Sequence, residues 1–241
     1  MSEGNELSYS VSHQLHELFR EERGLDVGLW RSVGAGYTKF AIESFLDEIA
    51  HAQGIDPVAF RLRLLAHNPR AQAVVRRVAE WAEWDRKRKN GRALGIGFSD
   101  TWRSYIGTVA EVSVDRKTGA IRVHEVWAVV DPGVAIQPDN VVAQIEGATI
   151  FGVSAALRER ITIENGAVKQ SNFHDYPLLR MADAPEINVR VTSTDNAPGG
   201  IGEVGLPPIA PAIGNAVFVL TGARLRALPM SPDRVLAAMR A

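Results

Sequence analysis

The chain has 241 residues, enough for one large domain or two small ones, and its 46% hydrophobic and 23% charged residues are ordinary for a globular protein. The net charge of −1 gives no basic field of the kind that attracts nucleic acid. The chain has no cysteine, which excludes disulfides, thiolate metal sites and iron–sulfur ligation by its own residues. Any redox chemistry must therefore use a bound cofactor or centres on another subunit.

Membrane and metal-binding signals are weak. No apolar run reaches the ~20 residues that a membrane span needs, so none is predicted. The stretch Met1–Glu6 is polar and acidic and is not a signal peptide, which favours a cytoplasmic location unless a partner chain carries an export signal to the periplasm. Of the six histidines only His13 and His16 would share a helix face, so no metal ligand is predicted.

Residues 1–90 are predicted to form a mainly helical segment. A loop at 28–36 carries Trp30-Arg31 before small residues, so it either presents the guanidinium or stacks it on Trp30. Helical spacing then predicts helices over about 40–53, 57–65 and 71–88, with Asp56-Pro57 opening the second. The cationic run 86–89 would suit the C-terminus of the third helix and is interpreted as its solvated end.

Residues 91–241 are predicted to form an α+β segment. Alternating patterns predict strands near 93–98, 105–114, 121–130, 160–164, 167–170 and 187–194. The turn signals are the stretch 115–119 and the pair Asn165-Gly166, which is typical of a type I′ turn. Helices are expected at about 137–152, 207–220 and after Ser231. With no linker between the segments, 1–90 and 91–241 are expected to form one continuous unit of mixed sheets with packed helices.

The most distinctive stretch is the glycine-rich loop Gly199–Ala212, which contains a single carboxylate, Glu203. Glycines allow close approaches that other residues forbid, and two prolines suit the first turn of the helix that follows. Glu203 is therefore predicted beside a helix N-terminus, whose N–H groups could meet an anionic ligand. The alternative is an ordinary surface loop with a solvated glutamate.

Seven short stretches, taken together and in order, carry a recognisable combination of residues. They are Trp30-Arg31-Ser32-Val33-Gly34, Val130-Asp131-Pro132-Gly133, Gln137-Pro138-Asp139, Ala143-Gln144-Ile145-Glu146-Gly147, Ser171-Asn172-Phe173-His174-Asp175-Tyr176-Pro177, Gly202-Glu203-Val204-Gly205-Leu206-Pro207-Pro208-Ile209-Ala210-Pro211-Ala212 and Thr221-Gly222-Ala223-Arg224-Leu225-Arg226-Ala227-Leu228-Pro229. From about Tyr9 to Pro229 the chain resembles the C-terminal part of the molybdopterin-binding large subunit of the xanthine dehydrogenase/aldehyde oxidase family. The nearest branch is the isoquinoline 1-oxidoreductase beta-subunit type.

The resemblance implies the C-terminal molybdenum-binding domain fold and a molybdopterin-dependent oxidoreductase. Such subunits hold molybdenum through the dithiolene of a molybdopterin, usually molybdopterin cytosine dinucleotide, without a protein ligand to the metal. They hydroxylate an N-heteroaromatic compound or an aldehyde with oxygen taken from water. Electrons leave through iron–sulfur clusters on a separate small subunit.

The resemblance also implies roles for particular residues. Glu203 corresponds to the catalytic base that takes a proton from the metal-bound hydroxyl, and Arg31 to an arginine on the substrate side. Gln144, Gly147, Gly202 and Gly205 correspond to the segments that contact the cofactor.

Two other side chains of these motifs receive structural interpretations instead. Asp131 is interpreted as a turn residue at the end of a strand, and His174 as a structural hydrogen-bonding residue rather than part of a substrate channel.

The chain departs from the family pattern in two ways. Val204 stands where the close branch commonly has proline, which would leave the loop less rigid. The N-terminal part of the large subunit is missing, so that part, an iron–sulfur small subunit and a small-molecule substrate are the expected partners, with no nucleic acid. The alternative is a non-catalytic split or truncated module for interaction or assembly that retains the fold.

Overall fold

The computed structural model describes Gly4, residues 8–17, Phe19, Glu21, Gly24 and residues 27–240. The signal-peptide prediction for Met1–Glu6 therefore falls, apart from Gly4, outside the described residues. The helices are α1 (Ala35–Ala52), α2 (Pro57–Leu64), α3 (Pro69–Trp81), α4 (Pro138–Leu157), α5 (Ile209–Thr221), α6 (Pro232–Ala238) and a short 3₁₀ turn, η1 (Met181–Asp183). The strands are β1 (Arg92–Ser99), β2 (Tyr105–Val114), β3 (Ile121–Asp131), β4 (Ile163–Glu164), β5 (Ala167–Val168) and β6 (Glu186–Val191). This confirms the predicted α+β class.

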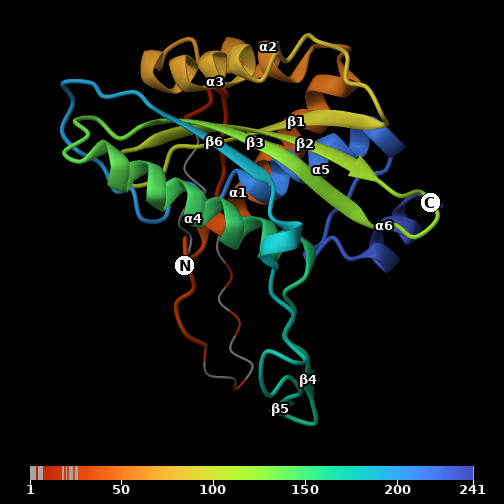
Figure 1. Cartoon of the computed structure of the whole chain (residues 1–241). Helices are drawn as coiled ribbons and strands as arrows, with labels where there is room; N and C mark the ends of the chain where they lie inside the picture. The colour runs from red at the N-terminus through yellow and green to blue at the C-terminus, as the bar shows by residue number, and fades with distance from the viewer. Residues whose placement is uncertain are drawn as a thin grey trace.

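The main sheet has four strands in the order β1-β2-β3-β6 (Figure 1). The first three strands form an antiparallel meander, and β6 pairs with β3 in parallel after the chain crosses over through α4. The turn between β2 and β3 forms as predicted, because the Asp115 carboxylate accepts the N–H groups of Lys117 and Thr118 at 2.8 and 3.2 Å.

Helices cover both faces of this sheet. In Figure 1, α2 and α3 lie above it, while α4 and α5 lie below. Strand alternation explains the division: Trp127 and Val129 belong to the cluster formed with α2 and α3, whereas Val126 belongs to the cluster formed with α5. Ala128 and Val130 pack in a third cluster with Ile145, on α4. This third cluster forms the floor beneath the candidate site.

Helix α5 lies so close to β1 that two strand residues must lack side chains. A Cβ on Gly95 would lie 2.1 Å from the carbonyl oxygen of Ala212, and one on Gly97 would lie 2.3 Å from that of Pro208. Because both obstacles are backbone atoms, neither can turn aside. The glycines of β1 thus fix the depth at which α5, and the loop before it, sit in the fold.

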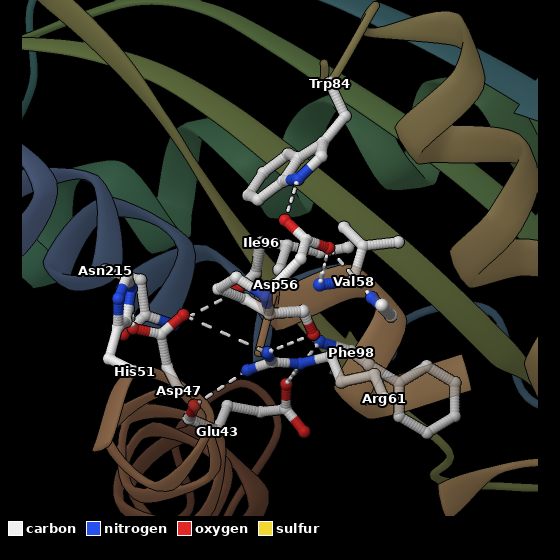
Figure 2. A network of polar contacts seen from close by, with 12 residues as sticks. Glu43, Asp47, His51, Asp56, Val58, Arg61, Trp84, Ile96, Phe98 and Asn215 are labelled. Carbon is white, nitrogen blue, oxygen red and sulfur yellow. Dashed lines mark hydrogen bonds and ion pairs between the residues drawn. The ribbon is translucent and has the colours of Figure 1, made fainter. Parts of the chain in front are cut away.

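A buried polar network joins α1, α2 and β1 (Figure 2). Arg61 is fully buried and donates from Nε to the Glu43 carboxylate at 2.9 Å and from Nη2 to the Glu43 carbonyl at 2.8 Å. The same carboxylate accepts the Tyr9 hydroxyl at 2.7 Å and the Phe98 N–H at 3.1 Å. Burial raises the pKa of Tyr9, and the negative charge of Glu43 raises it further. The network ties the N-terminal stretch to the end of β1.

The third predicted helix is shorter than expected. It ends at Trp81 rather than Arg88, because Glu83 adopts a left-handed backbone with φ 48° and the Trp84 N–H returns to the Ala79 carbonyl at 2.9 Å. The Trp84 indole then donates to Asp56 at 2.8 Å (Figure 2). The interpretation of run 86–89 as a helix end is therefore wrong; these cations follow the helix on a connecting loop.

Helix α4 is long and apolar enough to cross a membrane by length and composition alone. It is the only such helix found among the described residues, and 44% of its apolar window is buried inside the fold. A core helix passes the same test, so this is weak support for a membrane span.

Candidate active site

Three parts of the chain that are far apart in sequence meet at one place. They are the turn 31–34 that leads into α1, the second turn of α4 and the loop 199–208 that leads into α5. Arg31, Gln144, Gly147, Gly202 and Glu203, which the sequence singled out, all lie here. The hydrogen bond between Arg31 and Gly202 alone joins residues 171 positions apart.

Arg31 joins its own turn to the other two segments. Its Nε donates to the Gly202 carbonyl at 2.8 Å, and its Nη2 donates to the Gln144 carbonyl at 3.2 Å and to Gln144 Oε1 at 3.1 Å. Partial burial lowers the pKa of Arg31, and the nearby Glu203 charge opposes that effect. An arginine remains a cation at neutral pH, so these are charge-assisted hydrogen bonds.

The turn that carries Arg31 is strained and buried. Ser32 and Val33 have φ of 70° and 40°, in the left-handed region that is a clear outlier for a β-branched residue. The fully buried Ser32 donates its hydroxyl to the Glu203 carbonyl at 2.7 Å. Such strain persists only where surrounding contacts enforce it and is frequent at functional sites. Ser32 lies in the first of the seven sequence motifs, and the sequence alone assigned it no role.

The Glu203 loop is fixed from the other side by residues 100–104. The Gly200 N–H donates to the Trp102 carbonyl at 2.8 Å, and Gly199 has no room for a Cβ beside Ser104 and Arg103. Trp102 and Arg103 are themselves left-handed, with φ of 53° and 64°. A second strained turn therefore supports the start of the loop.

The Glu203 side chain contrasts with its restrained backbone. The Glu203 carbonyl accepts both the Ser32 hydroxyl and the Leu206 N–H, the latter at 3.2 Å. Its half-buried carboxylate accepts no hydrogen bond from any residue that the structure describes. The arrangement restrains the backbone at Glu203 while both carboxylate oxygens lack a partner among the described residues, as a proton acceptor requires.

The N-terminus of α5 differs from its expected form. Residues 204–217 are all buried, Pro207 and Pro208 have no N–H, and the Ile209 N–H is bonded to the Leu206 carbonyl at 3.1 Å. The expected set of exposed N–H groups for an anionic ligand is therefore not formed, and the helix begins at Ile209 rather than Pro207.

The four predicted cofactor-contacting residues divide into two kinds. Gln144, Gly147 and Gly202 are exposed; a Cβ on Gly147 would meet only Arg31 Nη1 at 3.7 Å, and one on Gly202 only Gln144 Oε1 at 3.9 Å. Gly205 is instead buried against α4, where a Cβ would lie 3.0 Å from side-chain atoms of Ala148 and Ile145. Gly205 thus allows the loop to pack closely on the helix, and its predicted contact with the cofactor stays a prediction.

Other residues around the site were less visible in the sequence. Trp30 packs on Phe151 of α4, with ring centroids 5.0 Å apart, and the Arg31 guanidinium lies 6.0 Å from the same ring. Phe151 follows Gln144 and Gly147 on one face of α4, and this helical spacing was its available signal. Val204 is fully buried in the cluster with Ile145, so side-chain packing restrains the loop at this position.

None of the contacts described above involves Asp131 or His174. Asp131 ends β3, pairs with Arg70 at 2.8 Å and accepts the Gly133 N–H at 2.8 Å, in agreement with a turn role. His174 is exposed and lies 3.6 Å from Asp175. Among the described residues no group of three or more His, Cys, Asp or Glu side chains could hold a metal ion.

Comparisons with known proteins add three findings. Residues 47–185 match the family model of the molybdopterin cofactor-binding domain. The chain is 43% identical to isoquinoline 1-oxidoreductase subunit beta of Brevundimonas diminuta, over 95% of this chain and 30% of that protein. It is 37% identical to the membrane-bound aldehyde dehydrogenase [pyrroloquinoline-quinone] of Gluconacetobacter polyoxogenes, over 89% of this chain and 30% of that protein.

Solved structures support the same architecture. The crystal structure of quinoline 2-oxidoreductase from Pseudomonas putida 86 superimposes with a TM-score of 0.76, covering 88% of this chain and 53% of that chain. At 14% sequence identity this is a likeness of fold alone. The chain spans 30% of the length of each of the two curated relatives named above.

Proposed function

The chain belongs to the family of molybdopterin cofactor-binding domains, and from that premise we propose that it is the C-terminal part of a molybdenum hydroxylase large subunit. The resemblance drawn from the seven motifs is confirmed by the family match and by the isoquinoline oxidoreductase relative. The proposed reaction is the oxidative hydroxylation of an N-heteroaromatic compound or an aldehyde with oxygen from water. The observation that supports it best is the convergence of Arg31, Gln144, Gly202 and Glu203 from three segments.

The exposed residues fit one side of a pterin cofactor. Gln144 uses its Oε1 for Arg31, while its Nε2 donors have no partner among the described residues and can bond pterin acceptors. Gly147 and Gly202 lack the Cβ atoms that would keep a flat ligand away from the backbone. We propose molybdopterin cytosine dinucleotide as the form bound, shared with the missing part of the subunit.

When bound, the molybdenum centre would accept the electrons of the oxidation and pass them to iron–sulfur clusters on a separate subunit. Glu203 would accept a proton on its carboxylate, because both oxygens lack a partner in the described part of the chain and the backbone on either side is held.

Arg31 would act mainly by positioning. Two of its three nitrogens are engaged in fixing Gly202 and Gln144, so it sets the distance between the base and the exposed face of α4. The charge of Glu203 acts to raise the pKa of Arg31 and so favours the guanidinium cation, and Nη1 would face the substrate.

A second candidate function is a non-catalytic module for interaction or assembly. The chain covers only 30% of its relatives, and without the remainder it could serve as a non-catalytic module for interaction or assembly. The retained contacts of Glu203 support the enzyme, since an assembly module has no need of a restrained backbone around an unbonded carboxylate.

The experiment is purification of the chain from its native host together with whatever polypeptides accompany it. Metal analysis and cofactor extraction should give about one molybdenum and one pterin nucleotide per complex, with oxidation of an N-heterocycle or aldehyde coupled to dye reduction. A complex without molybdenum would support the assembly module. Pyrroloquinoline quinone in place of a pterin would overturn the cofactor proposal.

A further inference from the structure

One segment projects from the body of the fold. Residues 159–180, here called the arm, leave the end of α4, form the β4–β5 hairpin and return to η1; Figure 1 shows them extending away from the sheet. The hairpin closes through the predicted turn, with Asn165 and Gly166 at φ of 52° and 78°. Each strand has only two residues, shorter than predicted.

The outer part of the arm is rich in exposed apolar side chains. They are Ile161, Ile163, Val168, Phe173 and Leu178. A two-stranded hairpin is marginally stable by itself and needs an apolar face covered by other structure. Several exposed apolar side chains on one projecting segment are typical of an interaction surface.

The base of the arm is held firmly. Arg158 and Arg122 both pair with Asp183, at 2.6 and 3.4 Å. The Leu179 N–H donates to the Ser154 hydroxyl at 2.9 Å, and the Tyr176 hydroxyl donates to Glu159 at 2.8 Å. A fixed base reduces the conformational entropy that docking would cost, so the arm is presented in a set direction.

The charges of the arm are balanced. Its three carboxylates are Glu159, Glu164 and Asp175, and its three cations are Arg160, Lys169 and Arg180. Two of these charges also pair with each other, Lys169 with Glu164 at 2.9 Å. This composition does not select a strongly acidic or basic partner, and apolar contact is what the arm offers.

We propose that the arm is the docking element for the remainder of the large subunit. The proposal rests on the function proposed above. The length of the relative indicates what covers the arm. This chain spans 30% of its isoquinoline oxidoreductase relative, so the part of that protein outside the match is more than twice as long as the matched part. The arm inserts its apolar side chains into that missing part and so joins the Glu203 side of the site to the rest of the pocket.

The test measures binding between this chain and a polypeptide made from the part of the Brevundimonas diminuta subunit that lies outside the matched region. The arm variant is V168S/F173S. The matched control is F45S/V219S, which removes the same residue types on α1 and α5; Val168 and Val219 are 55% and 54% exposed, and Phe173 and Phe45 are 70% and 58% exposed. Circular dichroism and thermal unfolding confirm that both variants remain folded.

The arm variant should weaken the dissociation constant at least about tenfold, while the control stays within about twofold. The proposal fails if wild type does not bind, if both variants weaken binding equally or if neither does. It also fails if sedimentation shows a homodimer that only the arm variant dissociates, since a second copy would then cover the arm. No step depends on molybdenum or turnover, so failure of the proposed activity would be seen separately.

Discussion

At the scale of single residues, the site depends on a restrained backbone beside an unrestrained carboxylate. Arg31 and Ser32 occupy the carbonyls of Gly202 and Glu203, leaving the Glu203 side chain as the group without a partner among the described residues. The sequence could place Arg31 and Glu203 near one active site only through family motifs. It could not indicate that Arg31 bonds the Glu203 loop, because local patterns do not report contacts between residues 171 positions apart.

Replacing Arg31 by lysine should loosen the Glu203 loop while preserving the charge. A lysine ammonium cannot reproduce the forked contacts of Nε and Nη2 with Gly202 and Gln144. We expect amide hydrogen exchange at residues 202–206 to accelerate by about tenfold or more, measured by mass spectrometry. The control is R76K, on an exposed position of α3. Unchanged exchange in R31K would show that Arg31 does not hold the loop.

Asp131 predicts a defined pH dependence of stability. Burial acts to raise its pKa, but hydrogen bonds from Arg70 and Gly133 and the Arg70 charge outweigh burial and lower it. Its contribution is therefore present above the unfolded pKa of about 4 and is lost as pH falls through the lower folded pKa.

In urea unfolding at pH 7, D131N should be less stable than wild type by about 1–3 kcal/mol. This difference should shrink progressively below pH 4, as the wild-type carboxylate becomes protonated too. An equal difference at pH 7 and pH 3 would contradict the assignment of the ionised form.

At the scale of elements, the position of the site is set by how helices meet the sheet. Turn and cap signals located most elements: Asp56 accepts the N–H groups of Val58 and Ala59 at 2.9 Å, as its predicted place at the start of α2 requires. Gly222 ends α5 in the left-handed conformation. The early end of α3 was not predicted, because Glu83 has no intrinsic preference for its left-handed backbone. The hydrogen bond from Trp84 to Asp56 accompanies that helix end. It joins residues 28 positions apart, and local sequence patterns do not report such contacts.

Gly95 tests the close approach of α5 to β1. An alanine Cβ there would collide with the Ala212 carbonyl, so G95A should force α5 to move and reduce the free energy of unfolding by about 1–3 kcal/mol. G28A is the control, because a Cβ on Gly28 meets nothing within 4 Å. Equal stability of the two variants in chemical unfolding would mean that the packing is looser than the structure shows.

Glu43 tests the buried network shown in Figure 2. E43Q keeps the side-chain shape but leaves the Arg61 charge with only Asp47, at 3.9 Å, as an acidic partner among the described residues. Breaking a buried pair from one side costs about 3–5 kcal/mol, and chemical unfolding should show a loss of that order. The matched variant E80Q, on an exposed position of α3, should change stability by less than about 0.5 kcal/mol. If E43Q lowered the free energy of unfolding only slightly, the Arg61–Glu43 pair would not be essential to the fold.

At the scale of the whole molecule, the proposed function makes the chain one side of an active site. The α+β class and the family could be predicted from the sequence patterns and the order of motifs. The environment of each residue within the site could not. Gly205 and Gly202 look alike in sequence, yet one packs against α4 and the other is exposed, because their environments come from α4 and not from the loop itself. The larger assembly that we propose rests on the projecting arm and on the 30% coverage of the isoquinoline oxidoreductase relative.

The most direct test of Glu203 as the base is turnover per molybdenum in the assembled complex carrying E203Q. The amide cannot accept the proton, so we predict a loss of at least about a hundredfold, with molybdenum content unchanged and E146Q, on the neighbouring exposed position of α4, close to wild type. If E203Q turns over at the wild-type rate per molybdenum, Glu203 is not the base and the central claim is wrong.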